Sequence, residues 1–320
     1  MSEFDLIKRI QSRVKPRADV VLGIGDDAAL LQVPAGQQLV VSTDTLIAGV
    51  HFPDDCAPAD IGWKALAVNL SDLAAMAATP AWCTLALTLP TDDGGWLDGF
   101  LDGFLELAEQ HDMQLIGGDT SRGPLSITVT VHGLVAEGRA LLRSRARIGD
   151  EIWVTGTLGD AAGGLQQWRA KKLQSAKLRY RLDRPTPRVE AGIALRDLAH
   201  AAIDLSDGLA ADLGHILASS GVGAEIDLGR LPTSATLHQH FPLEAERWRL
   251  QLAGGDDYEL CFTAPVTEAL AIEQAMAAGD TVVTAVGRIV TGHEIIFRTP
   301  EGEAYSLPSV GYDHFRSGNA

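Results

Sequence analysis

The sequence predicts a two-domain protein of the α/β and α+β classes, and three observations support this. The chain has 320 residues, enough for two domains of roughly 150 residues each. Its hydrophobic fraction of 46% and charged fraction of 21% are those of a chain that buries a substantial core. Strand and helix patterns alternate through the first half, and a new series opens after Gly149-Asp150. We therefore expect an N-terminal domain at residues 1–148 and a C-terminal α+β domain at residues 149–320.

Each element of the first half is indicated by the spacing of its apolar residues. Helical spacing marks one stretch near the N-terminus, and an apolar strand that ends in oxygen donors follows it. Asp60 can cap the next helix, and Pro80 ends it. In order, we expect a helix at 3–14, a strand at 39–45, a helix at 60–79, a strand at 82–89, a helix at 96–111 and a strand at 126–135.

The second half repeats the alternation with shorter elements. A strand opens at residues 151–156, and the basic stretch 171–188, which contains Pro185 and Pro187, predicts a helix followed by a loop. Short β-patterned runs complete this half. We expect these strands at 224–228, 259–263, 281–290 and 294–298.

Three features predict a cytoplasmic, non-membrane protein. The uncharged run 73–91 is as long as a membrane span, but it contains Pro80 and Pro90 and alternates after Pro80, so it predicts a helix end and a strand. The three cysteines are scattered without a Cys-x-x-Cys spacing, which fits a reducing compartment without a disulfide frame or a zinc site. The first residues also lack the order of a signal peptide.

The net charge of −16, from 26 basic and 42 acidic residues, argues against binding to a nucleic-acid backbone, which needs clustered cations. The same charge is compatible with several bound Mg²⁺ ions or with a cationic ligand. Solubility alone explains it equally well.

Three short segments combine glycine with aspartate. Ile116-Gly117-Gly118-Asp119-Thr120 precedes a strand pattern, the pair recurs at Gly254-Gly255-Asp256, and Gly23-Ile24-Gly25-Asp26-Asp27 is a thinner version. Glycine lets the backbone approach a ligand closely, and aspartate can hold a divalent cation. A single copy is a weak indication because turns favour these residues, and a surface turn remains the alternative for 23–27. Together they predict a phosphate site built from metal ions and backbone.

Further oxygen donors follow the first long strand and lie in the second helix. Ser42-Thr43-Asp44 supplies hard ligands for Mg²⁺, although such residues also cap helices. Asn69 and Asp72 share one face of an otherwise apolar helix. A carboxylate in a mostly buried helix is costly unless it is paired or metal-bound. Asp72 is therefore the strongest single candidate for a functional carboxylate.

The second half carries its own acidic site, and the one basic cluster of the sequence lies just before the expected domain boundary. Asp204-Leu205-Ser206-Asp207 echoes Leu70-Ser71-Asp72, and both copies are expected at helix starts, where capping is the alternative role. Residues 138–147 contain Arg143, Arg145 and Arg147, and guanidinium groups suit phosphate recognition. A solvated edge strand is the alternative, which we favour for Arg145 and Arg147.

In this order, the motifs resemble those of the thiamine-monophosphate kinase family, over nearly the whole length. The motifs are Gly23–Asp27, Ser42–Thr45, Asn69–Ala74, Ile116–Thr120, Asp204–Gly208 and Gly254-Gly255-Asp256-Asp257-Tyr258-Glu259-Leu260. That family is grouped with aminoimidazole ribonucleotide synthetase and selenophosphate synthetase. The resemblance implies the two-domain fold of this group, with an N-terminal sheet that forms a barrel across a homodimer. It also implies transfer of the γ-phosphoryl group of ATP to thiamine monophosphate, the final step of thiamine diphosphate biosynthesis.

The resemblance also implies roles for individual residues. The expected metal shell for several Mg²⁺ ions is Asp27, Ser42, Thr43, Asp44, Asp72, Asp119, Asp204 and Asp207. The expected contacts with ATP, the co-substrate, are Gly118, Asp119, Arg143 and Ser206, and the expected substrate contacts are His51, Asp256 and Phe315, with Tyr312 as the alternative aromatic residue. Members of the family often have glutamate at the position of Asp256. The aspartate of this chain keeps the negative charge, but its side chain is shorter.

The residues agree with a kinase that uses none of the common nucleotide motifs. The sequence has neither a Gly-x-x-x-x-Gly-Lys-Ser/Thr loop nor a His-Arg-Asp catalytic loop. An accepting phosphate, with a second pKa of about 6, is ionised at neutral pH and needs no general base. We therefore expect direct in-line transfer, with charge neutralisation by carboxylate-held cations and an acidic, aromatic pocket for the cationic thiazolium.

Three other functions are compatible with parts of this pattern. One is another ATP-dependent enzyme of the same group, although no Cys stands in an N-terminal glycine-rich segment as a selenophosphate synthetase would require. A second is a noncatalytic protein that binds divalent cations. A third is a metal-dependent phosphohydrolase that acts without ATP.

Overall fold

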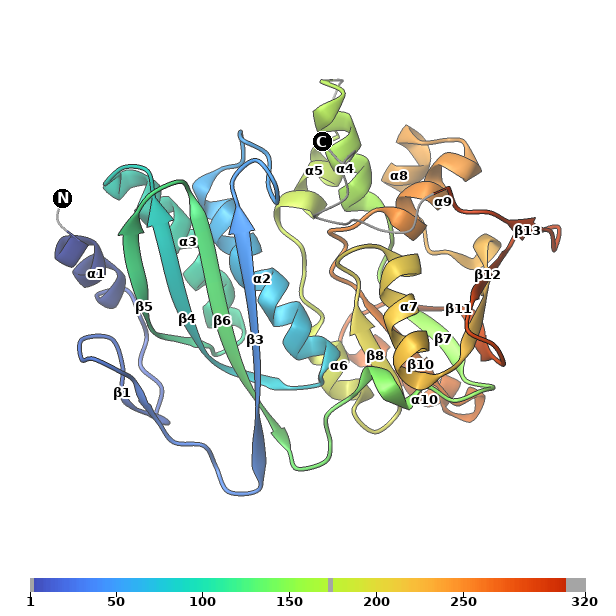
Figure 1. Ribbon diagram of the computed structural model, residues 1–320, viewed down its shortest axis with the longest axis horizontal. Helices are drawn as coiled ribbons and strands as arrows, with labels where there is room; N and C mark the ends of the chain where they lie inside the picture. The colour runs from blue at the N-terminus through green and yellow to red at the C-terminus, as the bar shows by residue number, and fades with distance from the viewer. Residues whose placement is uncertain (1–2, 172–174, 309–320) are drawn as a thin grey trace. The chain divides into compact units, whose positions relative to one another are not determined.

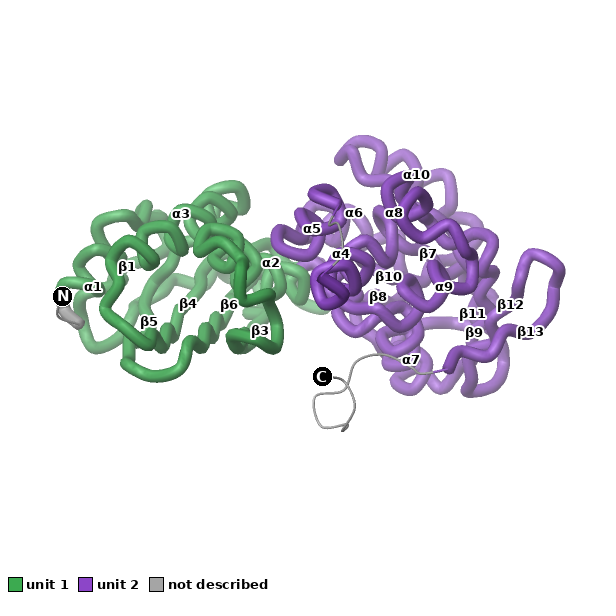
Figure 2. Tube along the Cα trace, turned by 90° about the horizontal axis from the view of Figure 1, so that it is seen from above, with its two compact units in different colours: residues 1–73, 78–138 green, residues 74–77, 139–320 purple. Residues whose placement is uncertain are grey.

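The computed structural model describes residues 3–171 and 175–308. They form two compact units, shown in Figure 2, and each is described by itself. Unit 1 comprises residues 1–73 and 78–138, and unit 2 comprises residues 74–77 and 139–320. The expected domain boundary at residue 148 falls inside unit 2.

A four-stranded sheet with helices on one face forms unit 1 (Figure 1). The strand order is β3-β6-β4-β5, with β3 and β4 antiparallel to β6 and β5 parallel to β4. Strands β1 and β2 pair separately from this sheet. In chain order, the helices and strands of the unit are α1 (Glu3–Gln11), β1 (Val20–Leu22), β2 (Leu30–Leu31), β3 (Gln37–Ile47), α2 (Pro58–Ala75), β4 (Thr79–Leu89), α3 (Gly94–Gln110), β5 (Gln114–Arg122) and β6 (Ser126–Ala136).

The alternation of buried and partly buried residues along β6 shows that one face of this sheet is covered. Ile127, Val129 and Val131 are buried, whereas the residues between them are only partly buried. Because successive side chains of a strand point to opposite faces, one face packs beneath α2 and α3 and the other is left more open (Figure 1). Asp93 begins α3, since its Oδ1 accepts hydrogen bonds from the N–H groups of Gly95 (2.9 Å) and Trp96 (3.0 Å).

Ion pairs connect the end of α1 and the segment after it with α3. Basic side chains of residues 9–17 face acidic side chains of α3 and the turn that follows it. Solvent-exposed ion pairs contribute little to stability, so these pairs hold the N-terminal segment against α3 but add little to the core. The pairs are Arg9–Asp98, Arg13–Asp102, Lys15–Glu109 and Arg17–Asp112.

One expectation for unit 1 is wrong, and one strand was not among the expected elements. Gly117, Gly118 and Asp119, expected before the strand at 126–135, lie inside that additional strand, β5, which pairs with β4 along its length. Leu70-Ser71-Asp72 lies in the body of α2 rather than at a helix start. Its echo at residues 205–207 lies in a loop before a helix, so the two copies are not structurally equivalent.

Unit 2 contains a seven-stranded sheet in the order β13-β12-β9-β11-β7-β10-β8. Its pairs are antiparallel except for β12 with β9. The core gathers buried apolar residues of the sheet and of helix α7, such as Val154, Ile203 and Leu213. The strands are β7 (Glu151–Thr155), β8 (Ala201–Asp204), β9 (Gly223–Asp227), β10 (Leu260–Ala264), β11 (Val283–Val290), β12 (Ile295–Arg298) and β13 (Ala304–Tyr305).

Helices of unit 2 connect these strands. The α-helices are α4 (Asp160–Arg169), α5 (Ala176–Asp183), α6 (Val189–Leu195), α7 (Leu209–Ser220), α8 (Ala235–His240), α9 (Glu244–Ala253) and α10 (Ala269–Ala278), and the 3-10 helices are η1 (Arg143–Arg145), η2 (Leu228–Arg230) and η3 (Val266–Glu268). The basic segment therefore forms a helical turn, η1, and not an edge strand. Across the described residues, no helix is both long and apolar enough to cross a membrane.

Candidate functional site

A pair of carboxylates lies between β3 and α2 in unit 1. Ser42 Oγ donates a hydrogen bond to Asp72 Oδ2 at 2.5 Å. The N–H of Asp44 donates to Asn69 Oδ1 at 3.1 Å, and Asn69 in turn donates to the carbonyl of Ala65. Strand alternation places Ser42 and Asp44 on one face, and the spacing of three residues places Asn69 and Asp72 on one side of α2. The structure thus brings together three of the residues expected in the metal shell.

The electrostatics of this pair favour a cation. Burial raises the pKa of Asp44 from its ordinary 3.8 to about 6, and the charge of Asp72 adds to the rise. Two carboxylates that repel each other, with a serine hydroxyl beside them, form an oxygen-only donor set. Such a set suits a hard divalent cation such as Mg²⁺, which removes the repulsion when it binds.

Replacing Asp44 by asparagine should stabilise the metal-free protein in a pH-dependent way. Because the folded-state pKa is raised, the folded protein binds the extra proton, and its stability falls as pH rises from about 4 through about 6. The raised pKa corresponds to a loss in the free energy of unfolding of about 3 kcal/mol at pH 8 and about half of that at pH 5, which the asparagine variant should regain. Urea denaturation of both proteins in EDTA at the two pH values measures it. A gain that is equal at pH 5 and pH 8 would contradict this explanation.

The same sheet places Asp119 away from Asp44. Asp44 pairs with Val129, and Val129 pairs with Leu85, which pairs with Gly118. Since β3 and β5 are the two edge strands of the sheet, three strand intervals of about 4.8 Å each, or roughly 14 Å, separate Asp44 from this end of the row. Asp119 follows Gly118 and therefore points to the opposite face. One sheet does not assemble Asp44 and Asp119 around a single ion.

Gly118 occupies a position that only glycine fits. A Cβ there would lie 1.9 Å from the carbonyl oxygen of Leu85, and the φ angle of +152° is one that other residues rarely adopt. The residue brings β5 close to β4 and leaves backbone exposed beside Asp119. The Asp119 Oδ2 accepts a hydrogen bond from Ser121 Oγ at 2.8 Å.

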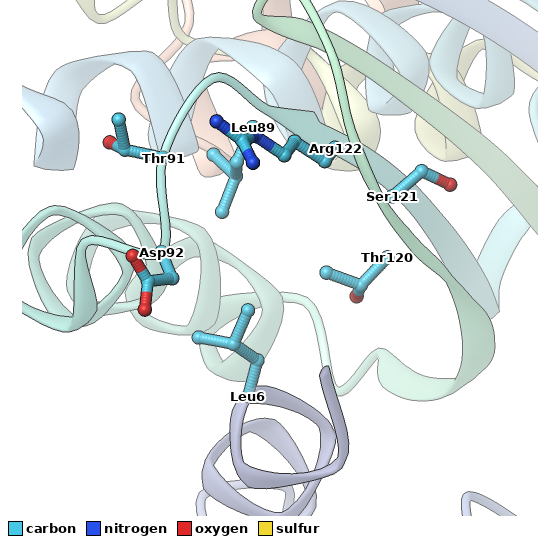
Figure 3. A pocket seen from close by; sticks show the side chains of 7 residues that line it. All are labelled: Leu6, Leu89, Thr91, Asp92, Thr120, Ser121 and Arg122. Carbon is cyan, nitrogen blue, oxygen red and sulfur yellow. The ribbon is translucent and has the colours of Figure 1, made fainter. Parts of the chain in front are cut away.

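A pocket of about 430 Å³ lies at the end of β5 in unit 1 (Figure 3). It combines apolar side chains with hydroxyl groups and one guanidinium group, so it offers surfaces for both the polar and the apolar parts of a ligand. The three residues that follow Asp119 in β5 belong to its lining. The lining residues are Leu6, Leu89, Thr91, Asp92, Thr120, Ser121 and Arg122.

The remaining predicted residues of unit 1 lie at separate points. Thr43 is on the open face of the sheet, where its hydroxyl bonds that of Thr130 at 2.9 Å. Asp27 is exposed in the loop between β1 and β2. His51 follows β3, and its Nδ1 accepts a hydrogen bond from the N–H of Ile47 at 2.9 Å. This bond leaves the proton of a neutral imidazole on Nε2, which can donate to a ligand oxygen.

Unit 2 brings the second acidic motif and the last Gly-Gly-Asp motif side by side. Asp204 ends β8 and pairs with Leu260 of β10. Beyond this pair the two loops continue to pair through their backbones, because the N–H of Tyr258 donates to the carbonyl of Leu205 and that of Asp256 to the carbonyl of Ser206, both at 2.9 Å. The ladder places Ser206 beside Asp256.

Asp212 of α7 fixes the first of these loops. Its Oδ2 accepts hydrogen bonds from the N–H groups of Asp207 (3.0 Å) and Gly208 (3.1 Å). Burial raises the pKa of Asp212 to about 7, and the nearby positive charge of Arg143 partly offsets the rise. Arg143 lies beside α7, where its carbonyl accepts a hydrogen bond from Ser220 Oγ at 2.8 Å. Phe315 and Tyr312 lie outside the described residues.

Sequence reasoning missed three groups at these sites. They are Asp212, the polar pocket after Asp119, and a buried cluster of Glu259 with Arg181 and Arg188. Asp212 could have been found, because an aspartate in the first turn of a helix that follows Asp207-Gly208 commonly accepts hydrogen bonds from the preceding loop. The other two depend on tertiary contacts and have no local signal.

Comparison with known proteins identifies the family. Residues 25–135 match the family model of the N-terminal domain of AIR synthase related proteins, and residues 147–299 match that of the C-terminal domain. The thiamine-monophosphate kinase of Escherichia coli K12 is 52% identical over 320 residues, with 98% of each chain covered. The chain belongs to the thiamine-monophosphate kinase family. The resemblance of its motifs and the expected two-domain AIR synthase-like fold are thereby confirmed.

Solved structures of thiamine-monophosphate kinases agree with this. The enzyme from Stenotrophomonas maltophilia has 53% sequence identity and a TM-score of 0.88, with 95% of this chain and 98% of that chain covered. A second relative, at 31% identity, was solved as a complex with AMPPCP and TMP and has a TM-score of 0.76. The match covers 98% of this chain and 96% of that relative.

Proposed function

We propose that this protein transfers the γ-phosphoryl group of ATP to thiamine monophosphate, which yields thiamine diphosphate and ADP. The observation that carries this proposal is the 52% identity to a thiamine-monophosphate kinase over the full chain. The relative that binds AMPPCP and TMP supports both substrates. The paired carboxylates of β3 and α2 add a cation site of the kind that phosphoryl transfer requires.

We propose that Asp44, Asp72 and Ser42 hold Mg²⁺, because their oxygen-only donor set and mutual repulsion fit this ion. When bound, Mg²⁺ supplies positive charge that offsets the phosphates of ATP and of the acceptor. The further ligands proposed from the motifs are Asp27, Thr43, Asp119, Asp204 and Asp207.

The chain's own residues bind and orient the two substrates. Gly118, which has no side chain, exposes the backbone of β5 to the triphosphate beside Asp119. Arg143 and Ser206 contact the nucleotide in unit 2, with a guanidinium group that matches phosphate oxygens. His51 Nε2, Asp256 and Phe315 contact thiamine monophosphate, where the carboxylate and the aromatic ring suit the cationic thiazolium.

Proton transfer has no essential role in this reaction. The accepting phosphate has a second pKa of about 6 and is ionised at neutral pH. We therefore propose in-line attack on ATP without a general base and without a phosphoenzyme. Rapid-quench labelling with γ-labelled ATP tests this step, and protein-bound phosphate would contradict it.

We also propose that the active form is a homodimer whose two sheets close a barrel. The open face of the sheet exposes Leu39, Val41 and Ile47, at 44%, 52% and 44% of their surfaces, and a second copy would bury them. Asp119 and Asp44 lie on opposite edges of one sheet. Apposition of two sheets would bring the edge β5 of one copy to the edge β3 of the other, which would let the site be completed across the interface.

Replacing Val41 by aspartate should break this dimer. The change places a carboxylate of each copy on the face that the dimer would bury, and burying an unpaired charge is costly. We expect wild type to sediment as a dimer and the variant as a monomer with little activity. Leu243→Asp is the control, because Leu243 is 68% exposed in unit 2. A monomeric wild type, or a variant that sediments as a dimer, would contradict the proposal.

A coupled ADP-release assay tests the function. Thiamine monophosphate should stimulate ADP release in the presence of Mg²⁺ and ATP, whereas free thiamine should not. Release stimulated by other acceptors instead would favour a different ATP-dependent enzyme of the AIR synthase group. Cation binding without ADP release would favour a noncatalytic protein, and cleavage of phosphate esters without ATP would favour a phosphohydrolase.

We also propose a cytoplasmic location and a division into two functional domains between residues 148 and 149.

A further inference from the structure

Unit 2 contains a fully buried carboxylate, Glu259, that binds two arginines. Its side chain has 0% exposure. Glu259 Oε1 accepts hydrogen bonds from Nη2 of Arg181 at 2.8 Å and Nη2 of Arg188 at 2.7 Å. Glu259 Oε2 accepts from Nε of Arg188 at 2.6 Å and from Oγ1 of Thr155 at 2.7 Å. Charge-assisted bonds of this geometry, shielded from water, hold a side chain in one position.

The surroundings are shaped to this carboxylate. A Cβ at Gly156 would lie 2.1 Å from Glu259 Oε1, and the φ of Gly156 is +59°, so this glycine both makes the turn after β7 and leaves space for Glu259. Thr155 Oγ1 also accepts the N–H of Leu260 at 2.8 Å. The start of β10 is thereby attached to the end of β7 through both side chain and backbone.

The segment that Glu259 anchors has an unusual backbone. Asp256 has φ +67° and Tyr258 has φ +48°, left-handed conformations that cost a non-glycine residue of order 1 kcal/mol or more. Such conformations persist only where the surrounding structure enforces them. On the C-terminal side of Asp256 the chain is fixed at Asp257, whose Oδ2 accepts the N–H of Gly159 at 2.8 Å, and then at Glu259, which follows Tyr258 directly.

The opposite loop has an anchor of its own. Asp212 Oδ2 accepts hydrogen bonds from the N–H groups of Asp207 and Gly208, so the Ser206–Gly208 loop has an anchor outside the side-chain cluster of Glu259. Three backbone bonds link the two segments, and the one from Asp256 to Ser206 lies farthest from Glu259. Loss of the Glu259 cluster should therefore displace Asp256 more than Ser206.

We propose that Glu259, held by Arg181 and Arg188, is a positioning residue that fixes Asp256 for contact with thiamine monophosphate. This inference rests on the proposed function and on the proposed contact of Asp256. Glu259 is buried and acts through the backbone of residues 256–258. The cluster thus sets the affinity for the acceptor, and nucleotide binding depends on the other loop.

Steady-state kinetics of Glu259→Gln test the proposal. Glutamine keeps the size and the bond to Thr155 but removes the charge shared with the arginines. We expect the KM for thiamine monophosphate to rise about tenfold, with kcat and the KM for ATP within about twofold of wild type. The matched control is Glu225→Gln, because Glu225 also binds two arginines, Arg288 at 2.8 Å and Arg298 at 2.7 Å, but lies on β9. The control should leave all three constants unchanged.

A double-mutant cycle with Asp256→Ala separates positioning from a general loss of stability. If Glu259 acts through Asp256, its replacement should not raise the KM further once Asp256 is alanine. An equal rise in both backgrounds, or an unchanged KM in the single variant, would overturn the proposal. If Glu259→Gln does not fold, Arg181→Gln removes one of the four bonds and should raise the same KM by a smaller factor.

Failure of this inference can be distinguished from failure of the proposed function. If wild-type protein does not phosphorylate thiamine monophosphate, the proposed function fails and the inference fails with it. If the wild type is active and Asp256→Ala raises the KM while Glu259→Gln leaves it unchanged, only the inference fails.

Discussion

Asp72→Asn is expected to lower turnover by at least about a hundredfold while the protein stays folded. The side chain faces Ser42 and Asp44 between α2 and β3, and asparagine keeps its size but removes the charge that a cation needs. Measurement of kcat at saturating Mg²⁺ and ATP tests this, together with circular dichroism to confirm folding.

Asp102→Asn serves as the control for that experiment. Asp102 is an exposed carboxylate of α3 that pairs with Arg13 on the surface, so its loss should change stability by less than about 1 kcal/mol and leave turnover unaffected. Near-normal activity of Asp72→Asn would remove this residue from the proposed metal shell.

Gly118→Ala is expected to disrupt β5 and to abolish activity. A Cβ at this position meets the carbonyl of Leu85 at 1.9 Å, and that backbone cannot move without breaking the pairing of β4 with β5. The combined overpacking and backbone strain should destabilise the protein by roughly 3 kcal/mol or more. Thermal unfolding of the purified variant measures the loss.

The neighbouring glycine provides a matched comparison. A Cβ at Gly117 has no atom within 4 Å, and its φ is not in the left-handed region, so Gly117→Ala should unfold within a few degrees of wild type. Equal melting temperatures for the two variants would contradict the explanation that the close approach of β5 to β4 requires Gly118.

Local periodicity was sufficient to predict the elements around the first site. The β pattern of residues 126–135 predicted β6. The cost of a carboxylate in an apolar helix pointed to Asp72, and the oxygen donors of β3 pointed to Ser42 and Asp44. The structure places these three together because strand and helix periodicity orient them toward each other.

The position of Gly118 could not be predicted in the same way. Two glycines followed by aspartate are typical of a turn, yet they lie within β5 because the strand pairs in parallel with β4, far away in sequence. Sheet order is a property of tertiary pairing, and it also determines that Asp119 and Asp44 occupy opposite edges.

Glu259 shows the same limit in unit 2. In the sequence it stands at the start of a β-patterned run, where a glutamate is usually solvated. Its partners, Arg181 and Arg188, are more than seventy residues away and come from α5 and from the residue before α6. Only the folded arrangement of these elements makes it a buried, fully paired carboxylate.

The most direct test of the account is the location of metal ions in crystals grown with Mn²⁺, a non-hydrolysable ATP analogue and thiamine monophosphate. Anomalous scattering should place Mn²⁺ at about 2.2 Å from carboxylate oxygens of Asp44 and Asp72, beside the phosphates of the analogue. Clear nucleotide density with no metal at these two aspartates would contradict the account.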